Sequence, residues 1–120
     1  MILHITTHKE WKTAQLQGKY TAPTLETEGF IHCSTLKQAT DTANIFFKGQ
    51  NGLALLCIDE NKLQSKCKYE DPTGGGNHDP NVGNLFPRIY GPINLSAVIK
   101  VVDFPPNENG FFTLPTEINI

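Results

Sequence analysis

Two short apolar segments, each followed at once by a helix-start signal, constrain the fold of this chain most. Residues 2–5 form an apolar run that begins almost at the first residue, and a capping-box pattern starts at Thr7. Residues 30–33 form a second apolar run, and a second capping-box pattern starts at Thr35. The sequence therefore predicts two strand–helix units in the first half of the chain.

The second half of the chain predicts strands with few helices between them. Strands that are unevenly separated, first by helices and later by loops, are typical of an α+β fold. We expect a split, mostly antiparallel sheet with two main helices. The other expected elements are a first helix ending at Gly18, a polar connection over 19–26, a second helix with Leu36, Ala39, Ala43, Phe46 and Phe47 on one face, strands over 53–58, 67–70, 97–104 and 111–114, and a helical turn over 59–63.

Length and charge narrow the possible classes of protein. A chain of 120 residues predicts one domain over 1–120. A formal net charge of −2, without long charged runs, argues against a partner such as duplex nucleic acid. No signal peptide or membrane-length apolar run is found, and three cysteines lack paired spacing, so we expect a reduced, cytoplasmic protein without a membrane partner. Residues 71–85, rich in Gly, Pro and Asn, predict a long loop that is either functional or mobile.

Two histidines lie inside the apolar runs and are the main candidates for a site. Strand alternation places His4 and Thr6 together, facing a cleft or solvent, and places His32 and Ser34 together on the second run. If the two strands are neighbours, both imidazoles lie near two helix N-termini, where backbone N–H groups suit phosphate. The alternatives are exposed or internally satisfied histidines, and a Ser34 hydroxyl that serves only as a cap.

Four further side chains carry chemistry that a ligand site could use. Glu28 and Glu70 are carboxylates next to strands, although a solvated loop or strand end explains them equally well. Arg88 suits an anionic ligand, and Tyr90, on the same strand face, suits stacking or hydrogen bonding. The alternative is a surface arginine beside a tyrosine that packs into the core.

A metal site and a phosphate loop are not expected. His4, His32 and Glu70 could supply three metal ligands, but their spacing is not that of a known ligand pattern. The glycines at 74–76 lack the lysine and the serine or threonine that complete a phosphate loop.

Four segments together resemble a known family: His4–Thr7, Glu28–Thr35, Tyr69–Asp71 and Phe86–Pro92. They resemble the bacterial domain-of-unknown-function 952 family. The resemblance covers nearly the whole chain and ends at Gly110–Pro115, with residues 71–85 as a local elaboration.

That family is similar in fold to the ADP-ribosyltransferase superfamily, in which a split antiparallel sheet holds NAD in a cleft. The resemblance implies that His4 takes the first-strand position, which binds ribose or anchors the nicotinamide side, and that His32 takes the second, beside the nicotinamide. A pair of histidines is more similar to the RNA 2′-phosphotransferase branch. For the third position, a carboxylate, the choice is open between Glu70 and Asp79, which lies in a segment similar to one in rifampin ADP-ribosyltransferases.

Two functions are therefore expected as alternatives. The first is an NAD-dependent enzyme that transfers ADP-ribose or acts on an RNA 2′-phosphate, with His4, His32 and Glu70 as catalytic residues and Arg88 holding pyrophosphate. The second is a non-catalytic module that binds a nucleotide or another small ligand on the same fold. In both, the expected binding residues are Thr6, Glu28, Ser34, Asp79, Arg88 and Tyr90.

Overall fold

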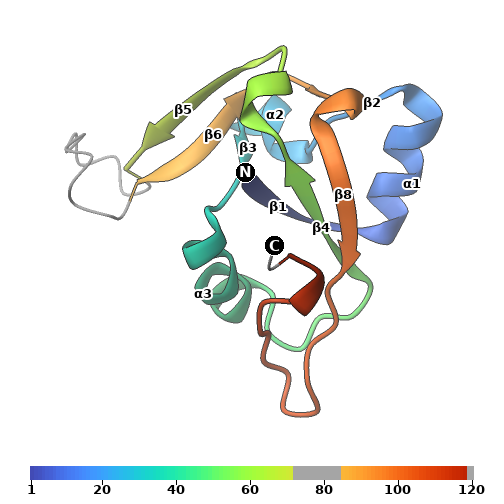
Figure 1. The fold of residues 1–120 in the computed structure, drawn as a ribbon, viewed down its shortest axis with the longest axis vertical. Coiled ribbons are helices and arrows are strands. Elements are labelled where there is room, and N and C mark those ends of the chain that lie inside the picture. Colours follow the sequence, from blue (N-terminus) through green and yellow to red (C-terminus); the bar gives the residue numbers. More distant parts are fainter. Residues whose placement is uncertain (72–84, 119–120) are drawn as a thin grey trace.

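The described part of the chain is an α+β structure with antiparallel sheets. The computed structural model describes residues 1–71 and 85–118. Their strands form three sheets, in the orders β1-β4-β8, β2-β7 and β3-β6-β5 (Figure 1). The helices are α1 (His8–Gln17), α2 (Pro23–Thr27) and α3 (Leu36–Phe46), and the strands are β1 (Ile2–Thr7), β2 (Lys19–Tyr20), β3 (Ile31–His32), β4 (Leu53–Ile58), β5 (Lys66–Glu70), β6 (Phe86–Tyr90), β7 (Ile93–Asn94) and β8 (Val98–Asp103).

The β4 strand is the central strand of the three-stranded sheet β1-β4-β8. It pairs antiparallel with β1 on one side and with β8 on the other. All six of its residues are buried, which confirms the prediction from its uninterrupted apolar run. The expected strands over 53–58, 67–70 and 97–104 are all present, within one residue at most ends.

The expected split sheet is divided further than predicted. A single backbone bridge, Leu3 with Ser34, connects β1 to the segment that follows β3. β3 itself has only two residues, and it pairs with β6 so that His32 lies opposite Arg88. The two histidine-bearing runs are therefore neighbours, as the site hypothesis requires.

Both capping signals mark real helix starts. The Thr7 side chain accepts a hydrogen bond from the Glu10 backbone N–H at 3.0 Å, and α1 ends at Gly18, whose φ of +82° is the left-handed conformation that glycine permits. Thr35 and Gln38 form the complete reciprocal capping box at the start of α3. The buried face of α3 consists of Ala39 and Ala43.

Two predictions about local structure are wrong, and the expected apolar face of α3 is buried only in part. Leu36 and Phe46 are 38% and 74% exposed, whereas Ala39 and Ala43 are buried. The connection over 19–26 contains β2 and the start of α2, since proline is well suited to a first helical position. Residues 111–114 are not a strand: the Asn44 side chain takes both the N–H and the C=O of Phe112, at 2.7 and 3.2 Å, where a neighbouring strand would pair.

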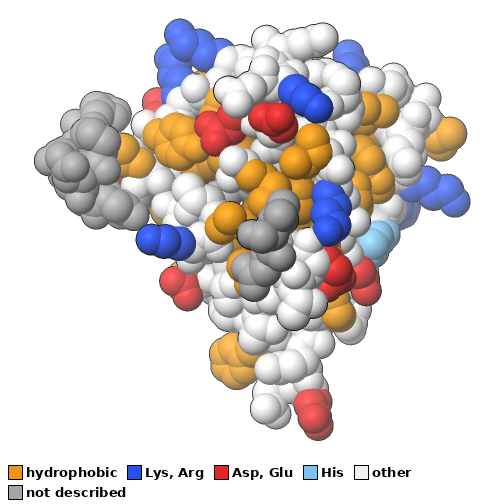
Figure 2. Space-filling view, in the orientation of Figure 1, with side chains coloured by type: hydrophobic (Ala, Val, Ile, Leu, Met, Phe, Trp, Pro, Cys, Tyr) orange, Lys and Arg blue, Asp and Glu red, His pale blue; other side chains and the backbone are white. Residues whose placement is uncertain are grey.

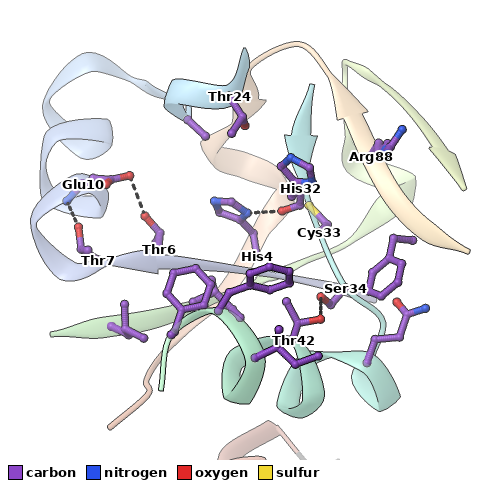
Figure 3. Close-up of a pocket in the computed structure, with 18 of the residues that line it drawn as sticks. His4, Thr6, Thr7, Glu10, Thr24, His32, Cys33, Ser34, Thr42 and Arg88 are labelled. Carbon is purple, nitrogen blue, oxygen red and sulfur yellow. Dashed lines mark hydrogen bonds between the residues drawn. The ribbon is translucent and has the colours of Figure 1, made fainter. Parts of the chain in front are cut away.

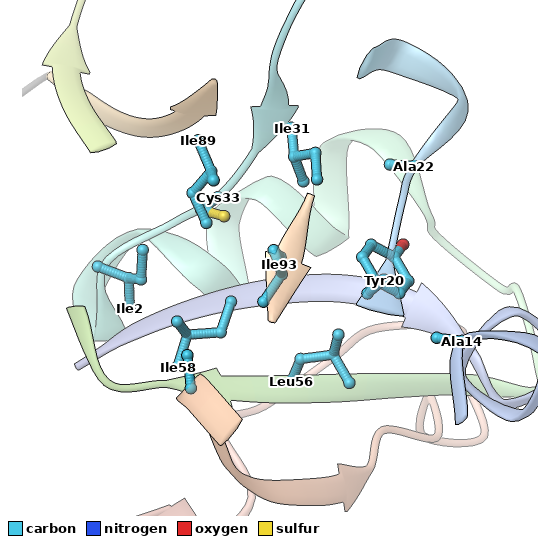
Figure 4. Close-up of a cluster of buried hydrophobic side chains, with 11 residues drawn as sticks. Ile2, Ala14, Tyr20, Ala22, Ile31, Cys33, Leu56, Ile58, Ile89 and Ile93 are labelled. Carbon is cyan, nitrogen blue, oxygen red and sulfur yellow. The ribbon is translucent and has the colours of Figure 1, made fainter. Parts of the chain in front are cut away.

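Among the described residues, the buried hydrophobic side chains form two core clusters. The first cluster lies between β1–β4 and the β3, β6 and β7 strands, and the second packs β1 and β4 against α3 and the C-terminal segment. The first contains Ile2, Ala14, Tyr20, Ala22, Ile31, Cys33, Leu56, Ile58, Ile89, Ile93 and Ala97 (Figure 4). The second contains Leu3, Ala39, Ala43, Leu53, Leu55, Cys57, Val102, Phe104, Phe112 and Ile118.

The surface and the helices give two further observations. On the face in Figure 2, acidic and basic side chains are interspersed. Among the helices in residues 1–71 and 85–118, none has the length and apolar character needed to cross a bilayer.

Shortening Leu55 should destabilise the protein strongly. Leu55 is fully buried, and replacing a buried leucine by alanine costs about 2–5 kcal/mol. The matched control is Leu16→Ala on α1, where the side chain is 84% exposed and the expected change is less than about 0.5 kcal/mol. Urea denaturation of both variants measures the two changes, and equal losses would contradict the central place of β4.

Candidate functional site

A pocket of about 830 Å³ opens between β1, β3 and α3. Its lining brings together six of the site residues expected from the sequence: His4, Thr6, Glu28, His32, Ser34 and Arg88. Figure 3 shows His4 pointing from β1 toward β3, with α3 along the opposite wall. The two imidazoles therefore contribute to the same hollow.

His4 is a buried histidine with both ring nitrogens bonded within the protein. Its Nδ1 lies 2.5 Å from the carbonyl oxygen of His32 and its Nε2 lies 2.7 Å from the Tyr20 hydroxyl. Because a carbonyl can only accept, the proton is on Nδ1, and in the neutral ring Nε2 accepts from Tyr20. Burial lowers the pKa of His4 from 6.5 to about 4, and the hydrogen bond to the His32 carbonyl opposes this only in part. His4 is thus neutral near pH 7.

The hydrogen-bonded chain continues from His4 through side chains of β2, β1 and α1. The Tyr20 hydroxyl is 2.9 Å from Thr6 Oγ1, and Thr6 Oγ1 is 3.2 Å from Glu10 Oε2. Tyr20 is 1% exposed, and burial raises the pKa of its phenol. The Glu10 side chain therefore accepts a hydrogen bond from Thr6, and it does not complete the capping box by bonding the backbone N–H of Thr7.

His32 differs from His4 in that its side chain is half exposed. Its Nε2 lies 3.1 Å from Glu28 Oε2, and the two side chains are 51% and 46% exposed. The Phe30 ring packs edge-on against the imidazole with centroids 4.8 Å apart. A histidine and a carboxylate in this contact can exchange a proton with a ligand at the pocket edge.

Arg88 lies beside His32 in the sheet and supplies a cation to the pocket. Its guanidinium sits 4.2 Å from the centre of the Phe30 ring, and Nη1 is 3.8 Å from a carboxylate oxygen of Glu70. The Tyr90 hydroxyl donates to Glu70. Among the described residues that line the pocket, neither Glu70 nor Tyr90 is found, so these two contact the pocket through Arg88.

The remaining sequence candidates have mixed outcomes. Ser34 is 3% exposed, and its hydroxyl lies 3.5 Å from Thr42 Oγ1 on α3. Asp79 lies outside the described residues. Within the described ranges, His, Cys, Asp and Glu side chains form no group of three or more that could hold a metal ion, and the absence of a metal stays a prediction.

The pocket wall that α3 provides was not predicted from the sequence. Residues of one helix face, among them Gln38, Asp41, Thr42 and Ile45, line the pocket together with Phe46. Their spacing of three and four residues was the available signal, but the prediction of this helix used only its other, mainly apolar, face. Tyr20 gave no signal, because a strand of two residues has no periodicity to detect.

The comparisons with known proteins identify the family. A family model described as "Protein of unknown function (DUF952)" matches residues 5–101. The chain belongs to this family. No curated protein matches it.

A solved structure shares the fold over nearly the whole DUF952 chain. The crystal structure of protein CC0527 from Caulobacter crescentus has a TM-score of 0.83 and 30% identity, covering 99% of this chain and 98% of that one. Its solution NMR structure has a TM-score of 0.79 and 30% identity, covering 98% and 95%. These relatives confirm the α+β fold, whereas the similarity to ADP-ribosyltransferases stays a prediction.

Acid should destabilise the protein through His4. The ring has a pKa of 6.5 when unfolded and about 4 when folded, so the unfolded chain binds more protons between these values. The free energy of unfolding should therefore fall as the pH drops through this range, by about 3 kcal/mol in total. Urea denaturation at a series of pH values should show this fall in the original protein and in His8→Gln, an exposed control, but not in His4→Gln. The same fall in His4→Gln would assign it to another group.

Proposed function

We propose that this protein binds a small ligand that has a planar apolar part and an anionic group, such as a nucleotide. The observation that carries this proposal is an open pocket with exposed apolar side chains on one element and a cation on another. Ile45 and Phe46 of α3 line the pocket although they are 71% and 74% exposed. Exposed apolar side chains in a concave site mark a binding surface.

The pocket supplies the groups that such a ligand needs. Its volume of about 830 Å³ falls within the range of roughly 300–1,000 Å³ typical of small-molecule sites. Phe46, Phe47 and Phe86 offer aromatic surface for a planar group. Arg88 suits an anion, because a guanidinium has five donors and its pairing with Glu70 does not exhaust them.

Binding without catalysis best explains the positions of His4 and Glu70, two of the three residues expected to be catalytic. Both ring nitrogens of His4 already have partners within the protein. Glu70 pairs with Arg88 and Tyr90. In this proposal His4 supports the pocket wall, His32 and Arg88 contact the anionic group, and Thr6, Glu28 and Ser34 contribute polar contacts.

An NAD-dependent transferase is the second candidate. The observation that favours it is the presence of pocket carboxylates, Glu10 and Glu28, since a carboxylate stabilises the positive charge that develops when the nicotinamide bond breaks. Glu28 also contacts His32, which could orient the leaving ring.

Removing the charge of Arg88 should weaken binding of a phosphate ligand specifically. We expect isothermal titration calorimetry to detect AMP binding, and Arg88→Gln to raise its Kd about tenfold or more, while adenosine binding stays unchanged. The control is Lys68→Gln, which removes the same charge from the residue paired with Arg88 across the sheet. Equal losses in both variants would indicate long-range attraction only, and no binding of AMP or NAD at millimolar concentration would contradict the proposal.

Incubation with NAD separates the two candidate functions. A binding module should leave NAD intact, so chromatography should find no more free nicotinamide than in a protein-free control. Release of nicotinamide that is lost in Glu28→Gln and kept in Glu70→Gln would replace the module by a transferase that uses a pocket carboxylate.

A further inference from the structure

A continuous chain of hydrogen bonds runs along the pocket wall from a buried ring to an exposed carboxylate. It joins His4 Nε2, the Tyr20 hydroxyl, the Thr6 hydroxyl and Glu10 Oε2, with successive separations of 2.7, 2.9 and 3.2 Å. Figure 3 shows its last bond, from Thr6 to Glu10. We propose that this chain is a proton relay, in which His4 and Glu10 exchange one proton through the two hydroxyls. The pocket then has a proton-transfer site for a ligand with an acidic or basic group.

The number of available protons allows two arrangements of this chain. Each hydroxyl has one proton and donates one hydrogen bond at a time. In one arrangement a protonated Glu10 donates to Thr6, Thr6 donates to Tyr20 and Tyr20 donates to Nε2, so the His4 ring is neutral. When Tyr20 donates to Thr6 and Thr6 donates to Glu10, Nε2 must carry a proton to bond Tyr20. The ring is then an imidazolium, because Nδ1 keeps its own proton for the His32 carbonyl.

One proton moves along the chain between the two arrangements. The Nε2–H bond of the imidazolium breaks and its proton joins the Tyr20 oxygen. Tyr20 passes its own proton to Thr6, and Thr6 passes its proton to the Glu10 carboxylate. Each hydroxyl gains one proton and loses one, so the products are a neutral imidazole and a carboxylic acid. No other reactant is needed.

The two ends of the relay lie in different surroundings. His4 is 7% exposed, whereas Glu10 is an exposed residue that lines the pocket. A ligand can therefore reach the Glu10 end, and the His4 end is shielded from water. His4 contacts Tyr20 from β2 and the carbonyl of His32 from β3, and the apolar Leu56 lies opposite it on β4. Glu10 from α1 reaches the Tyr20 hydroxyl at 3.4 Å, and Cys33 lines the same pocket.

The charges near the relay favour a neutral His4 in the absence of an anion. Burial disfavours the imidazolium most strongly, and the charge of His32 disfavours it further. The Glu10 carboxylate at the far end opposes these effects when the hydroxyls connect it to the ring. Removing Glu10 should therefore change the proton affinity of His4, and the size of that change should depend on Tyr20.

The test measures the pKa of His4 by NMR of its ring carbons in the protein without ligand. Four proteins form a cycle: the original chain, Glu10→Gln, Tyr20→Phe and the double variant. We expect Glu10→Gln to lower the proton affinity of His4 about threefold or more when Tyr20 is present, and to have less than about a third of that effect, as a shift in pKa, in Tyr20→Phe. Asp41→Asn, which removes a pocket carboxylate that is not part of the hydrogen-bonded relay, should have no comparable effect.

Three outcomes would overturn the relay. These are no shift in Glu10→Gln, equal shifts with and without the Tyr20 hydroxyl, and a shift in Asp41→Asn as large as that in Glu10→Gln. If Tyr20→Phe does not fold, the ring nitrogen shifts of His4 in the original protein near pH 7 decide instead. A proton on Nδ1 and a bare Nε2 support the relay, and the opposite tautomer overturns it. Because no ligand is used, failure of AMP to bind leaves these results unaffected.

Discussion

The contact between β1 and the segment after β3 is the constraint on which the pocket depends. Leu3 and Ser34 exchange both backbone hydrogen bonds at 2.7 Å, and the His4 ring adds a third bond to the carbonyl of His32. With only two residues in β3, this short joint rather than a long ladder holds the second sheet against the first. Each described buried side-chain polar atom has a hydrogen-bond partner. The polar groups at this joint therefore specify one arrangement without the energetic cost of a buried group that lacks a hydrogen bond.

The fold was predictable where local chemistry decides the structure. The capping boxes mark real helix starts because threonine satisfies backbone N–H groups that have no other partner. The uninterrupted apolar run of 53–58 predicted the central strand, because a strand that is buried on both faces has apolar side chains on both. The prediction failed at 111–114, where the residues are strand-like but their backbone partner is the side chain of Asn44, a contact 68 residues away that no local pattern encodes.

The candidate site was predictable in its strand residues and not in its helix residues. Alternation placed His4 and Thr6 on one side of β1, and both line the pocket. The sequence could not show that Tyr20 would occupy the second ring nitrogen, because Tyr20 reaches His4 through tertiary packing alone. The exposure of Phe46 could not be predicted, because an amphipathic helix pattern gives the width of the apolar face and not which part of it the core covers.

The bond between Asn44 and Phe112 gives the end of the chain a part in shaping the binding hollow. Asn44 precedes Ile45 and Phe46 on α3. Its side-chain amide accepts a hydrogen bond from the Phe112 N–H and donates one to the Phe112 carbonyl. The buried rings of Phe112 and Phe104 have centroids 4.8 Å apart and belong to the same core cluster as the buried residues of that helix. They therefore support the pocket wall that α3 forms. A cleavage or a fused tag near residue 112 would thus loosen the hollow without touching any residue that faces it.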